Sequence, residues 1–76
     1  MRFVLYHRIG HADSAAVRRR IVALDLKSRV DFQNVDDDGA AAFAARGGRR
    51  VPALWDGTSL HQGRDAALSV IEAMRR

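Results

Sequence analysis

Two side chains that could take part in catalysis stand close together near the start of the chain, His11 and Ser14 in the sequence RIGHADS. An imidazole can accept or donate a proton near neutral pH, and a serine hydroxyl at a helix start can hydrogen-bond a thiolate. Asp13 and Ser14 are also good N-cap residues, so a helix should begin beside them. No carboxylate or nucleophile is identifiable as a partner for His11. The pair is a candidate catalytic site, and a loop histidine beside a helix cap is the alternative.

The chain contains no cysteine. It therefore has no disulfide, no thiolate nucleophile and no thiolate metal ligand, so we expect no thiol–disulfide exchange by this chain alone. Asp36, Asp37 and Asp38 form a carboxylate cluster, but a calcium loop would alternate its oxygen ligands and end on a distal glutamate. We instead predict that these carboxylates cap a short helix and interact favourably with its dipole. No metal or other cofactor is predicted.

Length, composition and charge indicate one soluble globular domain over residues 1–76, with 47% apolar and 29% charged residues. The net charge of +4 could attract nucleic acid. However, the arginines are scattered, and the triplet at 18–20 points in divergent directions on a helix and forms no single basic stripe. We predict a solvated basic surface and no nucleic-acid site. Apolar runs are far shorter than the roughly 20 residues that span a bilayer, so the expected location is cytoplasmic.

The pattern of apolar residues and turn signals predicts alternating strands and helices followed by a hairpin and a last helix. A mixed four-stranded sheet flanked by helices, in the order βαβαββα, follows from this pattern. The predicted strands cover residues 2–7, 30–35, 51–55 and 59–61, and the predicted helices cover residues 15–27, 39–45 and 64–74.

The stretch at 49–65, RRVPALWDGTSLHQGRD, carries the strongest local signals. Pro52 cannot donate a hydrogen bond to a sheet ladder, so it should occupy the first residue of a strand. The dipeptide at 56–57, Asp-Gly, favours a tight hairpin turn. Gly63 should then release the chain into the last helix.

Val-Pro followed by strand, turn, strand, glycine and helix resembles the second half of glutaredoxins and other thioredoxin-fold proteins. Further positions match the family: Arg8 stands three residues before His11, Arg49 precedes the Val-Pro pair, and the sequence QGRD at 62–65 opens the last helix where the family has G-G-x-D. The resemblance covers the whole chain and implies a single thioredoxin-like domain with a cis peptide bond before Pro52. It departs from the family at the redox motif, because H-A-D-S replaces C-x-x-C.

The resemblance also implies a ligand-binding site for glutathione. In glutaredoxins the residue before the cis-proline, the start of the last helix and nearby basic residues hold this tripeptide. Helix N-termini favour anions in general, and the first and last helices should begin at the same edge of the sheet. The implied ligand-binding residues are Arg8, Arg49, Val51, Pro52, Gly63, Arg64 and Asp65.

Without a cysteine, the resemblance implies a non-redox binding module for glutathione, another small anion or a protein partner. The N-terminal domain of glutathione transferases is also similar, which leaves open a weak transferase-like enzyme that uses Ser14 or His11. The helical second domain of those enzymes is absent from this sequence, and Asp13 places a negative charge where a thiolate would bind. A structural or interaction domain without a small ligand is the third alternative.

Overall fold

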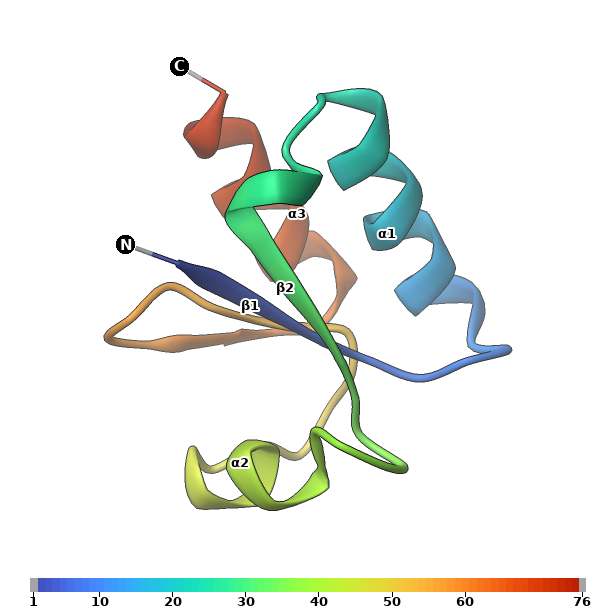
Figure 1. Ribbon diagram of the computed structural model, residues 1–76, viewed down its shortest axis with the longest axis vertical. Coiled ribbons are helices and arrows are strands. Elements are labelled where there is room, and N and C mark those ends of the chain that lie inside the picture. Colours follow the sequence, from blue (N-terminus) through green and yellow to red (C-terminus); the bar gives the residue numbers. More distant parts are fainter. Residues whose placement is uncertain (1, 76) are drawn as a thin grey trace.

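The computed structural model describes residues 2–75 and follows the predicted order of strands and helices (Figure 1). Its helices differ from the predicted ranges mainly at the first one, which begins and ends earlier than expected. The elements are β1 (Phe3–His7), α1 (Ala12–Ala23), a short 3-10 helix (Lys27–Arg29), β2 (Val30–Asn34), α2 (Ala40–Ala45), β3 (Ala53–Trp55), β4 (Leu60–Gln62) and α3 (Arg64–Met74).

The four strands form one mixed sheet, as predicted, and their order in the sheet is β2-β1-β3-β4. β1 runs parallel to β2 and antiparallel to β3, with Leu5 opposite both Phe32 and Leu54. β3 and β4 form the expected antiparallel hairpin. Since β1 and β3 lie in the middle of the sheet, they hold its most deeply buried residues.

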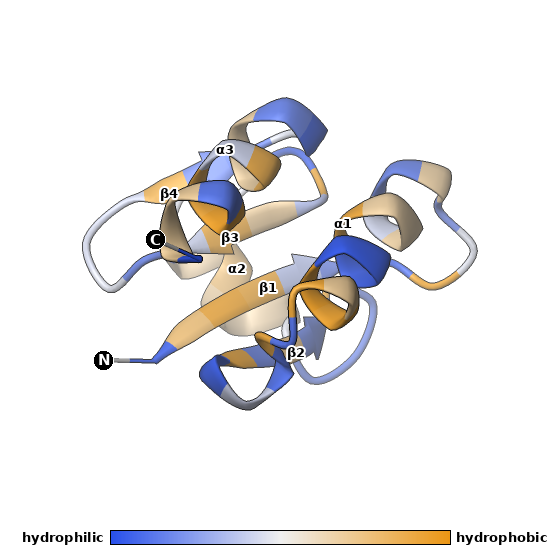
Figure 2. Ribbon diagram, turned by 90° about the horizontal axis from the view of Figure 1, so that it is seen from above, coloured by the Kyte–Doolittle hydropathy of each residue, from blue (hydrophilic) through white to orange (hydrophobic). Residues whose placement is uncertain are grey.

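Helices cover both faces of the sheet: α1 and α3 lie together on one face and α2 lies on the other (Figure 1). Between the helix pair and the sheet lies the main core, which includes the fully buried Leu5, Ile21, Leu54 and Ile71. A smaller cluster beneath α2 is built around Tyr6, whose ring centroid lies 5.5 Å from that of Phe43. Figure 2 shows β1 and β3 as hydrophobic strands between these layers.

The start of α1 differs from the prediction, because the helix begins at Ala12 and its N-cap is His11. The imidazole Nδ1 of His11 accepts a hydrogen bond from the backbone N–H of Ser14, at 3.3 Å. An N-cap side chain normally satisfies a free amide in this way, and His11 does so in place of the expected Asp13 or Ser14. Ser14 instead points inward and is fully buried.

The end of α1 was also predicted wrongly, because the helix stops at Ala23 and does not reach residue 27. Asp25 takes a left-handed conformation, with φ of 58°. The amides of Leu26 and Asp25 then donate to the carbonyls of Ile21 and Val22, both at 3.0 Å. This is a Schellman motif, which usually carries glycine and here carries an aspartate, one of the few other residues that tolerate this conformation.

The aspartates at 36–38 do not cap α2, which corrects the sequence prediction. The N-cap of α2 is Gly39, and no side chain caps the helix. Asp38 accepts a hydrogen bond from the backbone N–H of Asn34 at 2.9 Å, and Asp36 forms an ion pair with Arg8. These carboxylates therefore close the turn after β2. α2 ends at Ala45, as predicted, and Gly47 follows with a φ of 78°.

The hairpin between β3 and β4 is held by Asp56. Its Oδ1 accepts the backbone N–H groups of Thr58 and Ser59, and its Oδ2 lies 2.8 Å from Nε2 of His61. The hydrogen bond to His61, followed by those from Ser59 and Thr58, lowers the pKa of Asp56 to about 2. The hairpin thus has a four-residue loop, and β4 begins one residue later than predicted.

The Val51–Pro52 peptide bond is cis, as expected from the resemblance. Both residues precede β3, which begins at Ala53, so Pro52 adjoins the strand and does not form its first residue. The last helix has the predicted bounds, 64–74. Within residues 2–75, no helix is both long and apolar enough to cross a membrane.

Candidate functional site

A polar cavity of about 260 Å³ lies where the N-termini of α1 and α3 meet the loop before β3. The two helices begin at the same edge of the sheet, as predicted, because β1 and β4 both end there. Helix N-termini present free N–H groups and a positive dipole end, which favour a negatively charged group. The cavity is lined by Asp13, Arg50, Gln62, Gly63, Arg64, Asp65 and Ala66.

Hydrogen bonds from β4 fix the loop on which Arg50 stands. The side-chain oxygen of Gln62 accepts the backbone N–H groups of Arg49 and Arg50, at 2.7 and 2.9 Å. The backbone N–H of Gly63 donates to the carbonyl of Pro52 at 2.8 Å. The loop, the end of β4 and the start of α3 are thereby tied into one wall of the cavity.

Charges of both signs face the cavity. Arg64 bridges two carboxylates, with 3.6 Å from its Nη1 to Asp13 and 3.4 Å from its Nε to Asp65. The guanidinium of Arg50 lies over Gly63, since a Cβ added to that glycine would be 3.3 Å from its Nη2. Among residues 2–75, no side chain or carbonyl pairs with this guanidinium. Arg50 is therefore the free cation of the site.

The structure brings some of the expected ligand-binding residues together and leaves others apart. Gly63, Arg64 and Asp65 line the cavity. Arg49 and the cis Val51–Pro52 pair belong to the adjoining loop but are outside the lining. Arg8 is directed elsewhere, because its Nε forms a half-exposed ion pair with Asp36 at 3.0 Å.

Four lining residues were not among the expected ligand-binding residues: Asp13, Arg50, Gln62 and Ala66. Of these, only Asp13 was expected to bring a charge to the site. Arg50 is next to the expected Arg49, and Gln62 directly precedes the expected Gly63. Their closeness in sequence to expected residues was therefore the only sign that they line the site. The resemblance alone could not say which of the two adjacent arginines faces the cavity. That choice depends on the Gln62 hydrogen bonds, which orient the loop.

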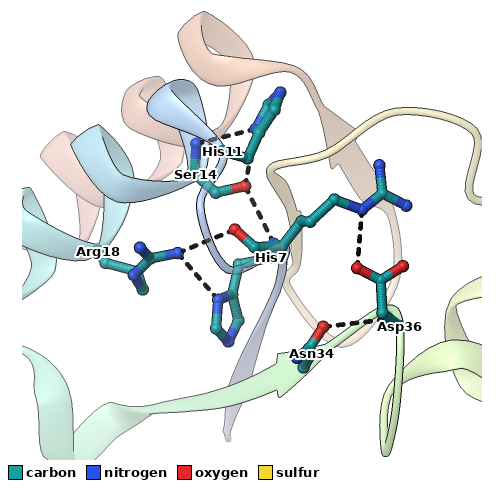
Figure 3. Close-up of polar contacts among 7 residues, drawn as sticks. His7, His11, Ser14, Arg18, Asn34 and Asp36 are labelled. Carbon is teal, nitrogen blue, oxygen red and sulfur yellow. Dashed lines mark hydrogen bonds and ion pairs between the residues drawn. The ribbon is translucent and has the colours of Figure 1, made fainter.

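The two candidate catalytic residues are engaged with each other and with the backbone (Figure 3). The Oγ of Ser14 lies 3.1 Å from Nδ1 of His11 and accepts the backbone N–H of Arg8 at 3.2 Å. Ser14 is fully buried. Because Nδ1 also accepts the Ser14 amide, a neutral His11 carries its proton on Nε2. The arrangement joins β1 to the start of α1, and it gives a substrate no direct access to the serine hydroxyl.

A second histidine, His7 at the end of β1, is almost fully buried and is paired with Arg18 (Figure 3). The Nη1 of Arg18 lies 3.0 Å from Nδ1 of His7 and donates to the carbonyl of Arg8 at 3.4 Å. Burial, together with the Arg18 charge, lowers the pKa of His7 below 6.5, partly opposed by the carboxylate of Asp38. The neutral imidazole thus accepts a hydrogen bond that holds the Arg18 guanidinium in place.

We expect the free energy of unfolding to decrease as the pH falls below 6.5, because His7 binds a proton more readily in the unfolded chain than in the folded one. The decrease should stop below the lowered pKa of the folded state. Urea unfolding over this pH range measures it. His7→Gln retains an acceptor for Arg18 without titrating, so its profile should be flatter. Identical profiles for the two proteins would contradict the assignment.

Among residues 2–75, no group of three or more histidine, aspartate or glutamate side chains is placed to hold a metal ion. Comparison with models of protein families, with curated proteins and with solved structures gives no significant match.

Proposed function

We propose that this protein is a glutaredoxin-like member of the thioredoxin fold that binds glutathione, or a chemically similar small anion, without redox chemistry. The observation that carries the proposal is the polar cavity between the starts of α1 and α3, with the free guanidinium of Arg50 at its wall. The absence of cysteine removes the thiolate that redox turnover by this chain would need.

The fold supports this family assignment through its topology. A parallel β1–β2 pair joined through α1 is followed by an antiparallel hairpin and a last helix, in the strand order β2-β1-β3-β4. The cis bond between Val51 and Pro52 lies beside the cavity, where the resemblance requires it. Fold alone does not define a function, and it is the charges of the cavity that indicate the ligand.

The mixture of charges in the cavity suits a zwitterionic ligand better than a simple anion. A carboxylate would lie against the start of α3 and the Arg50 guanidinium, which both favour negative charge. An ammonium group would face the carboxylates of Asp13 and Asp65, which Arg64 now bridges. Glutathione carries both groups at its γ-glutamyl end. Its thiol would remain free because no cysteine is present to bond with it.

Binding is expected to be weak. A hydrogen bond to a charged group contributes roughly 1.5–3 kcal/mol when it is well formed, but exposed ion pairs contribute about 0–1 kcal/mol. Without a covalent sulfur link, a dissociation constant on the order of high micromolar to millimolar follows. Added salt should weaken the interaction further.

An amide NMR titration with reduced glutathione tests the proposal. We expect saturable shifts at Gly63, Arg64 and Asp65, since these amides surround the expected carboxylate. Arg50→Ala should weaken binding roughly three- to tenfold. The control is Arg2→Ala, which removes an exposed charge before β1, at the opposite end of that strand from the cavity, and should leave the affinity unchanged.

Two further ligands define what the cavity recognises. S-methyl glutathione should bind as well as glutathione, because the proposal gives the thiol no bond to the protein. Acetate should bind more weakly, because it lacks the ammonium group. If near-saturating glutathione moves none of the cavity amides, the proposal is wrong.

Transferase-like catalysis through Ser14 is the competing function for the same region. The structure disfavours it, because the hydroxyl is fully buried and bonded to His11 and to the Arg8 amide. The possibility of a protein partner has a separate observation in its favour, on another face of the molecule.

A further inference from the structure

An apolar groove of about 470 Å³ lies along the outer side of α1, next to the edge strand β2. It is separate from the polar cavity, since the two share no lining residue. One side of the groove is formed by residues of α1, and the other by Phe32 of β2 and Lys27 of the short 3-10 helix before it. Figure 1 shows where α1 and β2 lie in the fold. The groove is lined by Arg18, Arg19, Val22, Ala23, Lys27 and Phe32.

The floor of the groove leaves large apolar side chains accessible. Val22 is 57% exposed, whereas Val17 and Ile21 of the same helix are buried in the core. Phe32 packs partly against the core, and its ring meets the edge of His7 at a centroid distance of 5.8 Å. Val22 and Ala23 follow Arg18 and Arg19 by four residues, which is about one helical turn. The two cations and the two apolar residues therefore lie next to each other on the same side of α1.

The rim of the groove carries three cations and no carboxylate. Within residues 2–75, neither Arg18, Arg19 nor Lys27 forms an ion pair with an acidic side chain. The next arginine, Arg20, differs, because it binds Glu72 of α3 through two hydrogen bonds of 2.6 and 3.0 Å. Of the three consecutive arginines, Arg20 is therefore neutralised by Glu72, while Arg18 and Arg19 leave their positive charges at the rim of the groove.

One of these cations is held in place before any partner binds. Arg18 donates to His7 and to the carbonyl of Arg8, which fixes its guanidinium at the groove. An ordered cation loses less conformational entropy on binding a carboxylate than a free side chain does. Together with the apolar floor, this favours a ligand that supplies an apolar side chain between negative charges.

We propose that the groove docks a short acidic segment of a partner protein, which inserts one apolar side chain between Val22 and Phe32 and places carboxylates against Arg18, Arg19 and Lys27. Charge complementarity selects an acidic partner over a neutral one, and the apolar floor selects a peptide over a nucleic-acid backbone. The proposal is independent of ligand binding in the polar cavity.

A synthetic peptide, acetyl-DELFED-amide, is a direct probe of the groove. In an amide NMR titration we expect saturable shifts along 18–23 and at Phe32, with no shift at Gly63. Removing the apolar anchor, in acetyl-DEAAED-amide, should weaken binding at least about tenfold, as should neutralising the acids, in acetyl-NQLFQN-amide.

Variants of the protein separate the groove from general charge attraction. Val22→Asp and Arg19→Glu should each weaken binding of acetyl-DELFED-amide at least about tenfold. Ala41→Asp adds the same carboxylate as Val22→Asp, but at an exposed position of α2 on the opposite face of the sheet, and should reduce binding less than twofold. Val22 is exposed, so its replacement should preserve the fold, which the amide spectrum of the free variant reports.

Four results would overturn the proposal. The first is the absence of groove shifts with acetyl-DELFED-amide, and the second is equal binding by Val22→Asp and the parent protein. The third is a concentration-dependent dimer in analytical ultracentrifugation that Val22→Asp abolishes, which would assign the groove to a second copy of the chain. The fourth is tighter binding of a single-stranded oligonucleotide to the same amides.

Discussion

Replacing Ile71 by alanine is expected to lower the free energy of unfolding by about 2–5 kcal/mol. Ile71 is fully buried in the middle of α3, within the main core between the helix pair and the sheet. Its removal leaves a cavity that the surrounding strands can fill only partly. A domain of 76 residues has a small core, so its total stability should lie near the lower end of the usual range of about 5–15 kcal/mol. The substitution should therefore populate the unfolded state measurably at 37 °C.

Urea unfolding followed by circular dichroism measures this effect. Ile9→Ala is the matched control, because it removes the same atoms from a loop residue that is 67% exposed. We expect the control to change the free energy of unfolding by less than about 0.5 kcal/mol. Equal losses for the two variants would show that α3 does not pack on the sheet as described.

The sequence predicted the elements whose pattern is local and complete. In α3, Gly63 marks the start, and Ala67, Ile71 and Met74 recur at helical spacing and are all buried, so both ends were predicted correctly. The pairs β1–β2 and β3–β4 follow from one crossover through α1 and one hairpin, whereas the pairing of β1 with β3 was not predicted. The helix and the two strand pairs are specified by short-range sequence signals that the tertiary structure does not override.

The ends of α1 could not be predicted in the same way, because each depends on an unusual residue. His11 caps the helix with a ring nitrogen, although aspartate and serine follow it and are the commoner caps. Asp25 ends the helix in a conformation that glycine normally takes. Residue preferences alone favour a later start and a longer helix.

The residues of the candidate sites were harder to predict than the helix ends, because their positions depend on long-range contacts. The family resemblance pointed to Arg8 as a ligand contact, but an ion pair with Asp36, which is 28 positions away, turns it elsewhere. The expectation that the arginine triplet forms no single basic stripe is confirmed, because Arg20 binds Glu72 of α3 while its two neighbours face a groove beside α1. Arg18 and Arg19 line this groove together with Lys27. The sequence alone could not predict the groove, because it forms only where Phe32 of β2 lies beside α1.

Replacing Gly63 by alanine is expected to disturb both the fold and the polar cavity. Gly63 has φ and ψ of 94° and 159°, a region that is almost restricted to glycine, so a side chain there costs roughly 1–3 kcal/mol. The new Cβ would also lie 3.3 Å from Nη2 of Arg50, so the free guanidinium would have to shift by a few tenths of an ångström. Glutathione binding should therefore weaken, but by less than the roughly three- to tenfold expected for Arg50→Ala.

The control for Gly63→Ala is Gly47→Ala. Gly47 also has a positive φ, 78°, but a Cβ there would meet nothing within 4 Å. It should therefore cost on the order of 1 kcal/mol of stability through backbone conformation and leave glutathione binding unchanged. Urea unfolding and the amide titration, applied to both variants, separate the two effects. If Gly63→Ala loses stability but binds glutathione normally, a ligand contact at the present position of the Arg50 guanidinium is contradicted. If Gly63→Ala keeps both its stability and its glutathione binding, the backbone conformation at the start of α3 is not the one described.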